Sequence, residues 1–397
     1  MRDILTPPDR RANANEYTKR RFKLIETGKM DITFFALVLI LLTIGLVMLF
    51  SASYAFAYQR FGNSYHFITR QLGFAVFGVA AMYFFSRIDY HIYRKFAWPL
   101  YVISVALLII ARLIPPMMDG FHRWIYINIG GTSINFQPSE IGKFAIVALF
   151  AHLISKNYTQ MKTFKFGILT FGALLMTIVG LVLIGRHLSA AVIIFIMGFA
   201  MMIIGGIRMK YVGIGLGAGA AGVATVAFTG VIDYALTRFR YWRDPWADPQ
   251  GLGYQTIQSL LAIGSGGLLG AGLGQSRQKY LWVPEPHNDF IFSIVAEELG
   301  FIGAFIIVVL FACLVWRGFA IAMRAPDKFG SLLCVGLVFQ VGLQAVLNML
   351  VVTNTIPNTG ISLPFFSYGG TALLMLMAQM GVVLSISRSC RLEKSPG

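Results

Sequence analysis

Apolar runs of about 17 to 25 residues recur along this chain, and each is long enough to cross a bilayer as a helix. The short stretches between them hold most of the polar residues. The pattern predicts an all-α polytopic membrane protein with ten transmembrane helices. Their expected positions are residues 32–52, 71–86, 97–114, 139–154, 166–185, 188–206, 211–231, 289–316, 329–352 and 367–387. A large loop, residues 232–288, separates the seventh helix from the eighth.

One further apolar stretch lies within that loop, from Tyr254 to Gly274. Six glycines from Gly264 onward weaken it as a lipid-exposed helix. An eleventh crossing would also place the basic residues that follow Arg317 on the wrong side for the charge rule. We therefore expect an interfacial or re-entrant element, with Gln255 and Gln258 on its wet side.

The distribution of Lys and Arg predicts the orientation, because cytoplasmic loops retain basic residues. With the N-terminus inside, 22 of the 33 Lys and Arg residues fall in cytoplasmic segments. Both termini are then cytoplasmic, and the loop 232–288 is outside. The expected organisation is a basic cytoplasmic tail (1–31), a ten-helix membrane domain (32–387) and a short cytoplasmic tail (388–397).

Composition excludes several classes of function. The net charge of +16 is explained by membrane topology and anionic membrane lipid rather than by nucleic acid. The three cysteines lie in helices or the inner tail, so no disulfide framework is implied. The chain has no P-loop, no dinucleotide fingerprint and no zinc-type histidine pair. Energy for any reaction must come with the substrate, from a gradient or from a partner.

Asp289 is the most informative residue, because it stands where the polar segment Pro284–Phe290 enters an apolar helix. A charge at that position costs several kcal/mol unless it faces water or a partner, so it indicates a functional site. An N-terminal helix cap is the alternative interpretation of Asp289. His287, two residues earlier, is weaker evidence, since a histidine beside a helix start is often only a hydrogen-bonding cap.

Other polar residues gather at the same outer edge. They are Arg70, Arg123, Glu140 and Lys143, and Glu297 and Glu298 lie two turns deeper in the eighth helix. Glu140 and Lys143 share one helical face, where a structural ion pair is as plausible as catalysis. For one of Glu297 and Glu298 we favour capping or pairing within the bundle over catalysis.

The outer loop interleaves arginines with aromatic residues from Arg238 to Trp246, and a glycine-rich stretch follows, ending at Lys279. Guanidinium groups and exposed backbone amides suit an anionic phosphate or pyrophosphate. Aromatic side chains stack on sugars and anchor at the interface. The combination predicts a lipid-linked, phosphorylated and glycosylated ligand at the outer leaflet.

Several long motifs occur in one order along the chain. They are FQPSE-x-x-K (Phe136 to Lys143), R-x-x-Y-W-x-D-P (Arg238 to Pro245), GYQ-x-x-QSL-x-AIGSGG (Gly253 to Gly267), G-x-GLG-x-S-x-QK (Gly270 to Lys279), PEPH-x-DFIF-x-x-x-x-EELGF (Pro284 to Phe301) and LPF-x-SYGG (Leu363 to Gly370). With these motifs the chain resembles the SEDS family (shape, elongation, division and sporulation). The segment from Pro357 to Gly370 is closer to the FtsW and SpoVE type than to the RodA type. The resemblance covers nearly everything except the two tails.

The resemblance implies a GT-C-like membrane glycosyltransferase that polymerises lipid II, an undecaprenyl-pyrophosphate disaccharide-peptide, into peptidoglycan at the outer face of the cytoplasmic membrane. It also implies a class B penicillin-binding transpeptidase as partner, other divisome proteins, a location at the division septum, and a divalent cation (Mg or Mn) whose ligands the sequence does not identify. By motif, the family's essential aspartate falls on Asp289. The residues we predict as catalytic are Asp289, Lys143, Glu140 and His287; those we predict to bind substrate are Arg70, Arg123, Arg238, Arg240, Arg243, Lys279 and Ser367.

The implied chemistry agrees with the residues. An inverting transfer needs a base for the incoming hydroxyl, for which Asp289 is our hypothesis, and stabilisation of the departing diphosphate, for which the loop arginines are suited. Lys143 is a candidate to pair with Asp289 at rest. Two positions depart from the family pattern: Asn288 replaces a frequent threonine, and Arg186 with His187 replaces an acidic Pro-Asp-x-Gly element. No role of that element is transferred to this chain.

Three readings from different classes stay open: a lipid II polymerase, a lipid II flippase, and a non-catalytic scaffold for a transpeptidase. A flippase would need a polar path through the bundle, for which Glu297 and Glu298 are the deep acidic candidates in the eighth helix. A scaffold has no need of Asp289. Division, sporulation and elongation are not separated by the sequence.

Overall fold

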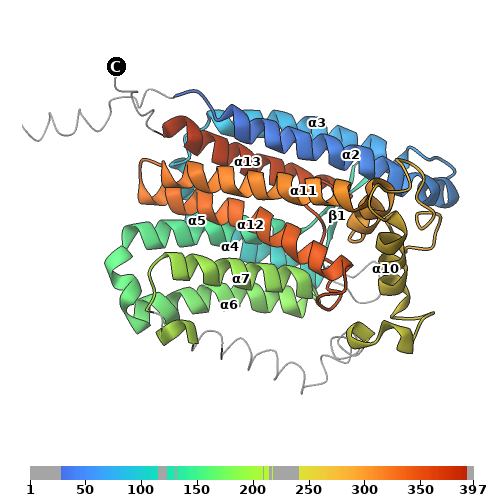
Figure 1. Cartoon of the computed structure of the whole chain (residues 1–397). Helices are drawn as coiled ribbons and strands as arrows, with labels where there is room; N and C mark the ends of the chain where they lie inside the picture. The colour runs from blue at the N-terminus through green and yellow to red at the C-terminus, as the bar shows by residue number, and fades with distance from the viewer. Residues whose placement is uncertain are drawn as a thin grey trace, which may run out of the picture.

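The computed structural model describes residues 28–114, 123–129, 132–208, 210–213, 217 and 241–390. The described chain is a bundle of long apolar helices that run side by side (Figure 1). These helices are α2 (Ile32–Phe61), α3 (His66–Arg87), α4 (Ile92–Leu113), α5 (Pro138–Lys156), α6 (Phe171–Ile184), α7 (Leu188–Ile204), α11 (Ile291–Met323), α12 (Lys328–Val352) and α13 (Gly370–Ser389). A π-helical segment, Phe164–Thr170, leads into α6.

Within the described ranges, eight helical segments are long and apolar enough to cross a membrane, and α7 is a shorter apolar helix. Each coincides with one of the predicted helices, so the all-α membrane fold is confirmed. The seventh predicted helix, residues 211–231, falls almost entirely outside the described residues. So do most of residues 1–31, the start of the outer loop and nearly all of the C-terminal tail.

Two predicted boundaries were wrong in an informative way. The first helix was expected to end at residue 52, but α2 continues to Phe61 and ends on Gly62, which has φ 68° and donates to the Tyr58 carbonyl. The extra turns carry exposed aromatic side chains, Tyr54 and Tyr58 among them, which suit the membrane interface better than its core. The second helix begins at His66 rather than at residue 71, which adds a polar turn at the same end.

A β-hairpin was missed by the sequence analysis. Strands β1 (Ile125–Ile129) and β2 (Thr132–Phe136) pair antiparallel, with Ile129 opposite Thr132. The Thr371 hydroxyl of α13 donates to the Asn135 carbonyl at 2.7 Å and so ties β2 to the bundle. The hairpin leads directly into α5, and it therefore fixes how that helix enters the membrane.

Helix α5 is the central element of the bundle. Of its 19 residues, 14 are buried, and it packs against α4, α6, α7 and α12. A helix that is apolar all round is expected at such a central position. Its first turns nevertheless carry Glu140 and Lys143, which the fold thereby brings into the interior of the protein.

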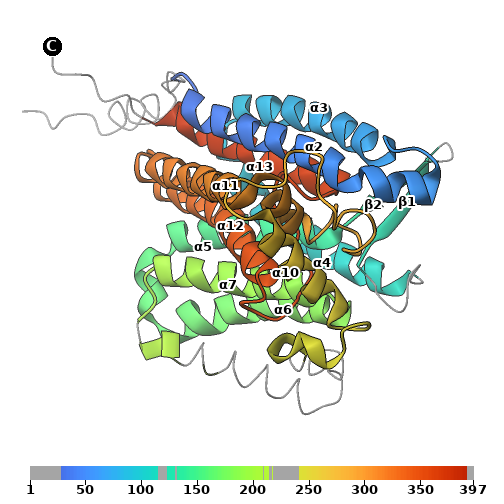
Figure 2. The same ribbon diagram turned by 45° about the vertical axis from the view of Figure 1, so that its right-hand side comes forward.

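The segment Tyr254–Gly274 contains a helix that is too short to span a bilayer. Helix α10 (Tyr254–Gly266) has 13 residues and lies against the ends of α11 and α12 (Figure 2). The glycine-rich chain that follows reaches a break in α11 at Gly300, where φ is 69° and ψ is −173°. The two segments exchange four backbone hydrogen bonds, from Ala271 to Glu297, Gly272 to Glu298, Phe301 to Gly267 and Ile302 to Leu268. Thus the backbone groups freed by the break are satisfied within the protein, as an apolar environment requires.

Candidate functional site

The start of α11 holds Asp289 in a rigid backbone setting. Three consecutive carbonyl groups, those of residues 287, 288 and 289, each accept a hydrogen bond from another segment. Their donors are the backbone amide of Tyr368, the hydroxyl of Ser367 and the side-chain amide of Asn348, at 2.9, 2.7 and 2.7 Å. The Asn348 amide also donates to the Ile361 carbonyl at 2.6 Å. The half-buried Asp289 is therefore positioned by α12 and by the irregular chain between α12 and α13.

Gly360 lies directly beside the Asp289 carboxylate. It adopts φ 69°, and a Cβ atom at this position would stand 3.0 Å from Asp289 Oδ2. A side chain here would meet both backbone strain and the carboxylate oxygen. The glycine thus keeps open one approach to Asp289.

His287 is buried in an aromatic setting and is 3% exposed. Its ring centroid lies 4.1 Å from that of Phe67 and 5.0 Å from that of Phe56. Burial lowers the pKa of His287 to about 4, so the imidazole is neutral near pH 7. Among the described residues its Nδ1 atom has no hydrogen-bond partner. A neutral imidazole at this position can accept or donate one hydrogen bond to a ligand, while its catalytic role stays a prediction.

Glu140 and Lys143 form the local ion pair that was one of the two alternatives, with Lys143 Nζ 2.8 Å from Glu140 Oε1. Lys143 is 2% exposed, and its ammonium also donates to Gln344 Oε1 at 3.2 Å. The Gln344 amide in turn donates to the carbonyl and the hydroxyl of Ser362. This pair is therefore linked to the same chain segment that positions Asp289. The proposed pairing of Lys143 with Asp289 and the catalytic roles of Glu140 and Lys143 stay predictions.

The remaining predicted arginines differ in their surroundings. Arg70 is exposed on the first turns of α3, one turn after Phe67. Arg123 donates through Nε and Nη2 to the Arg186 carbonyl, at 3.1 and 2.6 Å, and so connects the hairpin to the turn between α6 and α7. Arg243 is exposed. Arg238 and Arg240 lie outside the described residues, and for all five arginines a substrate contact stays a prediction.

Lys279 lies apart from this group and serves the fold. It is 3% exposed, and its Nζ atom lies 2.9 Å from Glu298 Oε1 and 3.2 Å from the Ser51 hydroxyl. The neighbouring Glu297 carboxylate accepts the Arg277 amide at 2.8 Å and is hydrogen-bonded to the Ser276 hydroxyl. The two deep glutamates thus hold the outer loop, and their described ion pair is with that loop rather than with another helix of the bundle. No described contact of Lys279 points to a ligand, and its role in substrate binding stays a prediction.

Several residues near the site were not predicted. His187 is half-buried, its Nδ1 atom lies 3.2 Å from Gln137 Nε2, and desolvation, Arg123 and Lys143 together lower its pKa to about 3. Gln71 of α3 donates to the Ser367 carbonyl and accepts from the Gly369 amide. The sequence did contain a signal for the part that α12 plays in the site. Gln344 and Asn348 are two amides four residues apart, and they mark one polar face in an otherwise apolar helix.

A dedicated metal centre is not evident. In the part of the chain that the structure describes, no three His, Cys, Asp or Glu side chains gather closely enough to hold a metal ion. Asp289 and the paired Glu140 are the acidic groups of the site. A hard cation that also binds substrate phosphates needs only one or two protein carboxylates, so this donor set does not build a cage but suits such shared ligation.

Comparison with known proteins identifies the family. The family model for FtsW, RodA and SpoVE, described as cell cycle protein, matches residues 31–392, which is most of the chain. This chain belongs to the FtsW/RodA/SpoVE family. The family assignment agrees with the SEDS resemblance, and members of the FtsW/RodA/SpoVE family are also its structural neighbours.

Two relatives illustrate the branch within the family. Stage V sporulation protein E of Bacillus subtilis is 40% identical over 368 residues, with 91% of this chain and 98% of the relative covered. The probable peptidoglycan glycosyltransferase FtsW of Trichlorobacter lovleyi is 36% identical over 386 residues, with 96% and 98% covered. These values favour the FtsW/SpoVE branch, as predicted.

Solved structures of family members have the same architecture. A chain of a peptidoglycan synthase complex, studied for the structural coordination of polymerization and crosslinking, superposes with a TM-score of 0.75 at 27% identity, covering 90% of this chain and 98% of that one. The rod shape determining protein RodA of Thermus thermophilus superposes with a TM-score of 0.66 at 25% identity, covering 92% and 98%.

Proposed function

We propose that the protein is a peptidoglycan glycosyltransferase that polymerises lipid II at the outer face of the cytoplasmic membrane. The observation that carries this proposal is the fixed placement of Asp289: three successive carbonyls at the start of α11 are held by Asn348, Ser367 and Tyr368. A residue that only capped the helix would not need its backbone anchored to two other segments. The names of the FtsW relatives support the same activity.

The residues suit an inverting transfer. In our proposal the Asp289 carboxylate accepts the proton of the sugar hydroxyl that attacks the anomeric carbon of the donor, and the donor's diphosphate departs. Arg70, Arg123 and Arg243 are the described arginines that would neutralise this leaving group. The Lys143 ammonium, buried and balanced by Glu140, would supply a hydrogen-bond donor fixed in place beside the reaction.

A divalent cation is a further proposal. It would neutralise the charge of the diphosphate and take ligands from the substrate as well as from the protein. Its test is polymerisation by the purified protein after treatment with EDTA, followed by return of Mg²⁺ or Mn²⁺. Activity that is unaffected by EDTA would remove the cation from the reaction.

The assembly is proposed from the solved relatives. A matching chain comes from a peptidoglycan synthase complex that combines polymerization with crosslinking. We propose that this chain likewise acts with a class B transpeptidase, and with other divisome proteins at the septum, both termini facing the cytoplasm. The positive-inside pattern supports this orientation.

The decisive experiment measures glycan strands formed from purified lipid II by the full-length protein, alone and with a class B partner. Wild type is compared with Asp289→Asn, a near-isosteric change that removes the base. Glu285→Gln is the matched control, because it removes an exposed carboxylate four residues away whose described contact is with the Asn288 side chain. Polymer from wild type and the control, with none from folded Asp289→Asn, is the expected result.

Other outcomes would support the alternatives. Equal polymer from Asp289→Asn would remove this residue as the base while leaving the polymerase intact. No polymer from any variant, with partner and cation present, would favour transport or scaffolding. The structure offers no specific support for a transport path along the deep glutamates, because Glu297 and Glu298 are both engaged by the outer loop.

A further inference from the structure

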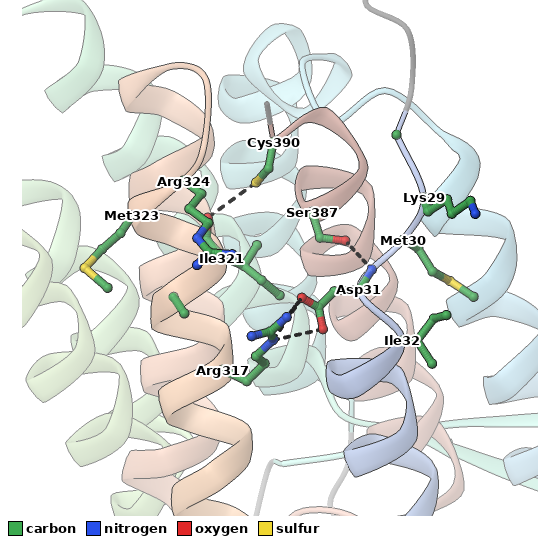
Figure 3. A pocket seen from close by; sticks show the side chains of 12 residues that line it. Lys29, Met30, Asp31, Ile32, Arg317, Ile321, Met323, Arg324, Ser387 and Cys390 are labelled. Atoms are coloured by element: carbon green, nitrogen blue, oxygen red, sulfur yellow. Dashed lines mark hydrogen bonds and ion pairs between the residues drawn. The ribbon is translucent and has the colours of Figure 1, made fainter. Parts of the chain in front are cut away.

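A cavity of about 690 Å³ lies at the opposite end of the bundle from Asp289. Its wall is formed where α2 begins and where α11 and α13 end (Figure 3). Its charged lining residues are Lys29, Asp31, Arg317 and Arg324. This volume is in the range of pockets that bind a small molecule or a head group.

The lining carries excess positive charge. Arg317 is neutralised by Asp31, since Nη2 lies 2.7 Å from Oδ2 and Nε donates to both carboxylate oxygens. Asp31 itself is fixed by capping α2, where it accepts the Phe34 amide at 2.9 Å. Lys29 and Arg324 are both exposed, and among the described residues neither has a carboxylate within ion-pair distance. The cavity therefore presents two cations beside a pre-formed ion pair.

The exposed side chains around the cavity are of the kind found at a membrane interface. Trp316, next to Arg317 along α11, is 75% exposed, and the lining residue Met323 is 78% exposed. An exposed tryptophan near a helix end is typical of the head-group region of a bilayer. Since Gly28 and Cys390, the two ends of the described chain, both line the cavity, the positive-inside pattern puts it at the inner leaflet. This assignment depends on the orientation but not on the proposed catalytic activity.

The chain's own tails are poor occupants of this cavity. Residues 1–27 contain seven Lys and Arg against four Asp and Glu, and residues 391–397 contain two basic residues and one acidic residue. Both tails share the sign of the cavity and would be repelled. An anionic ligand is favoured instead, and the exposed Trp316 and Met323 favour one that is anchored in lipid.

We propose that this cavity binds the phosphate head group of an anionic phospholipid from the inner leaflet. Lys29 and Arg324 contact the phosphate, and the Arg317–Asp31 pair forms the floor. A lipid held there connects the start of α2 to the ends of α11 and α13. Basic pockets between transmembrane helices at the cytoplasmic side are suited to such head groups.

The test uses the full-length protein purified with defined lipids. Phosphatidylglycerol and phosphatidylcholine are titrated separately. Bound lipid is counted by native mass spectrometry, and the midpoint of thermal unfolding is measured on the same samples. We expect phosphatidylglycerol to bind and to raise the midpoint. The Lys29→Gln/Arg324→Gln double variant should bind it more weakly, by on the order of 30-fold. Lys95→Gln, an exposed cation at the start of α4 that does not line the cavity, is the control and should bind like wild type.

Two results would overturn the proposal. Equal retention of phosphatidylglycerol by wild type and the double variant would show that the cations do not bind it. Stabilisation by millimolar inorganic phosphate that matches the lipid, and is lost in the double variant, would assign the cavity to a soluble anion instead. The midpoint of thermal unfolding in phosphatidylcholine alone shows whether each variant is folded. If the double variant is misfolded by this measure, the single variant Lys29→Gln takes its place.

Discussion

The junction between the re-entrant loop and the break in α11 makes a sharp prediction about two glycines. Gly270 and Gly274 have nearly the same left-handed backbone, with φ of 82° and 80°. A Cβ atom at Gly270 would stand 2.2 Å from the Glu298 carbonyl oxygen and 2.6 Å from the Gly300 nitrogen, whereas at Gly274 nothing lies within 4 Å. Alanine at either site carries the same conformational cost, but only Gly270→Ala must push two backbone segments apart.

The expected magnitude follows from what that separation breaks. The left-handed conformation costs an alanine about 1–2 kcal/mol, and this cost is common to both variants. Gly270→Ala should also break the four backbone hydrogen bonds between the loop and α11, each of which contributes about 0.5–1.5 kcal/mol to stability. The difference between the variants should therefore be about 2–6 kcal/mol.

The assay compares unfolding of both variants in one detergent, by size-exclusion recovery after heating and by unfolding in a mixed denaturing detergent. Gly274→Ala should lose only the conformational cost of about 1–2 kcal/mol and should keep lipid II polymerisation. Gly270→Ala should unfold at a much lower temperature and lose polymerisation, because the loop leads to Asp289. Equal stability of the two variants would refute the claim that close backbone approach holds the loop to the broken helix.

Two further predictions concern buried ionisable groups. Lys279→Met should destabilise the protein by about 3–5 kcal/mol, because it leaves the buried Glu298 carboxylate without its cation. The double variant Lys279→Met/Glu298→Gln should recover most of that loss in the same unfolding assay, and a double variant as unstable as the single one would contradict the coupling. For His287, the folded pKa of about 4 lies below the unfolded value of 6.5. As the pH falls, the histidine is therefore protonated in the unfolded chain before it is protonated in the folded protein. The free energy of unfolding should be highest above pH 6.5 and should fall by up to about 3 kcal/mol as the pH drops toward 4. His287→Gln should make the midpoint less dependent on pH in this window, while His187 keeps part of the slope, and an unchanged slope would argue against a neutral buried His287.

The sequence predicted the parts of this fold that lipid dictates. Helices such as α6 and α12 were located because a bilayer requires about 20 apolar residues in succession. The β-hairpin was missed because five-residue strands carry little pattern, and its pairing depends on a turn and on a contact with α13. The extension of α2 was missed because hydropathy ends where aromatic residues begin to face the interface.

In the site, the sequence likewise indicated the residues that stand out from a local apolar pattern, but not the contacts that depend on packing. Asp289 was recognisable since a carboxylate at the start of an apolar helix needs an explanation. The contacts of Lys279 with Glu298 and Ser51 were not predicted, and the one with Ser51 joins parts of the chain that are far apart in sequence. Such contacts depend on packing, which no local pattern encodes.

Asn348 has a consequence for how activity is controlled. Its single amide group bonds the carbonyl of Asp289 on one side and that of Ile361 on the other. Asp289, the proposed base, and the facing chain segment therefore share one support, and that support belongs to α12, a helix long enough to cross the membrane. A displacement of about 1 Å at a reacting group can cost on the order of 100-fold in rate. Any force that slides α12 along its axis, whether from a bound protein or from the bilayer itself, would therefore lower the reaction rate without contacting the substrate.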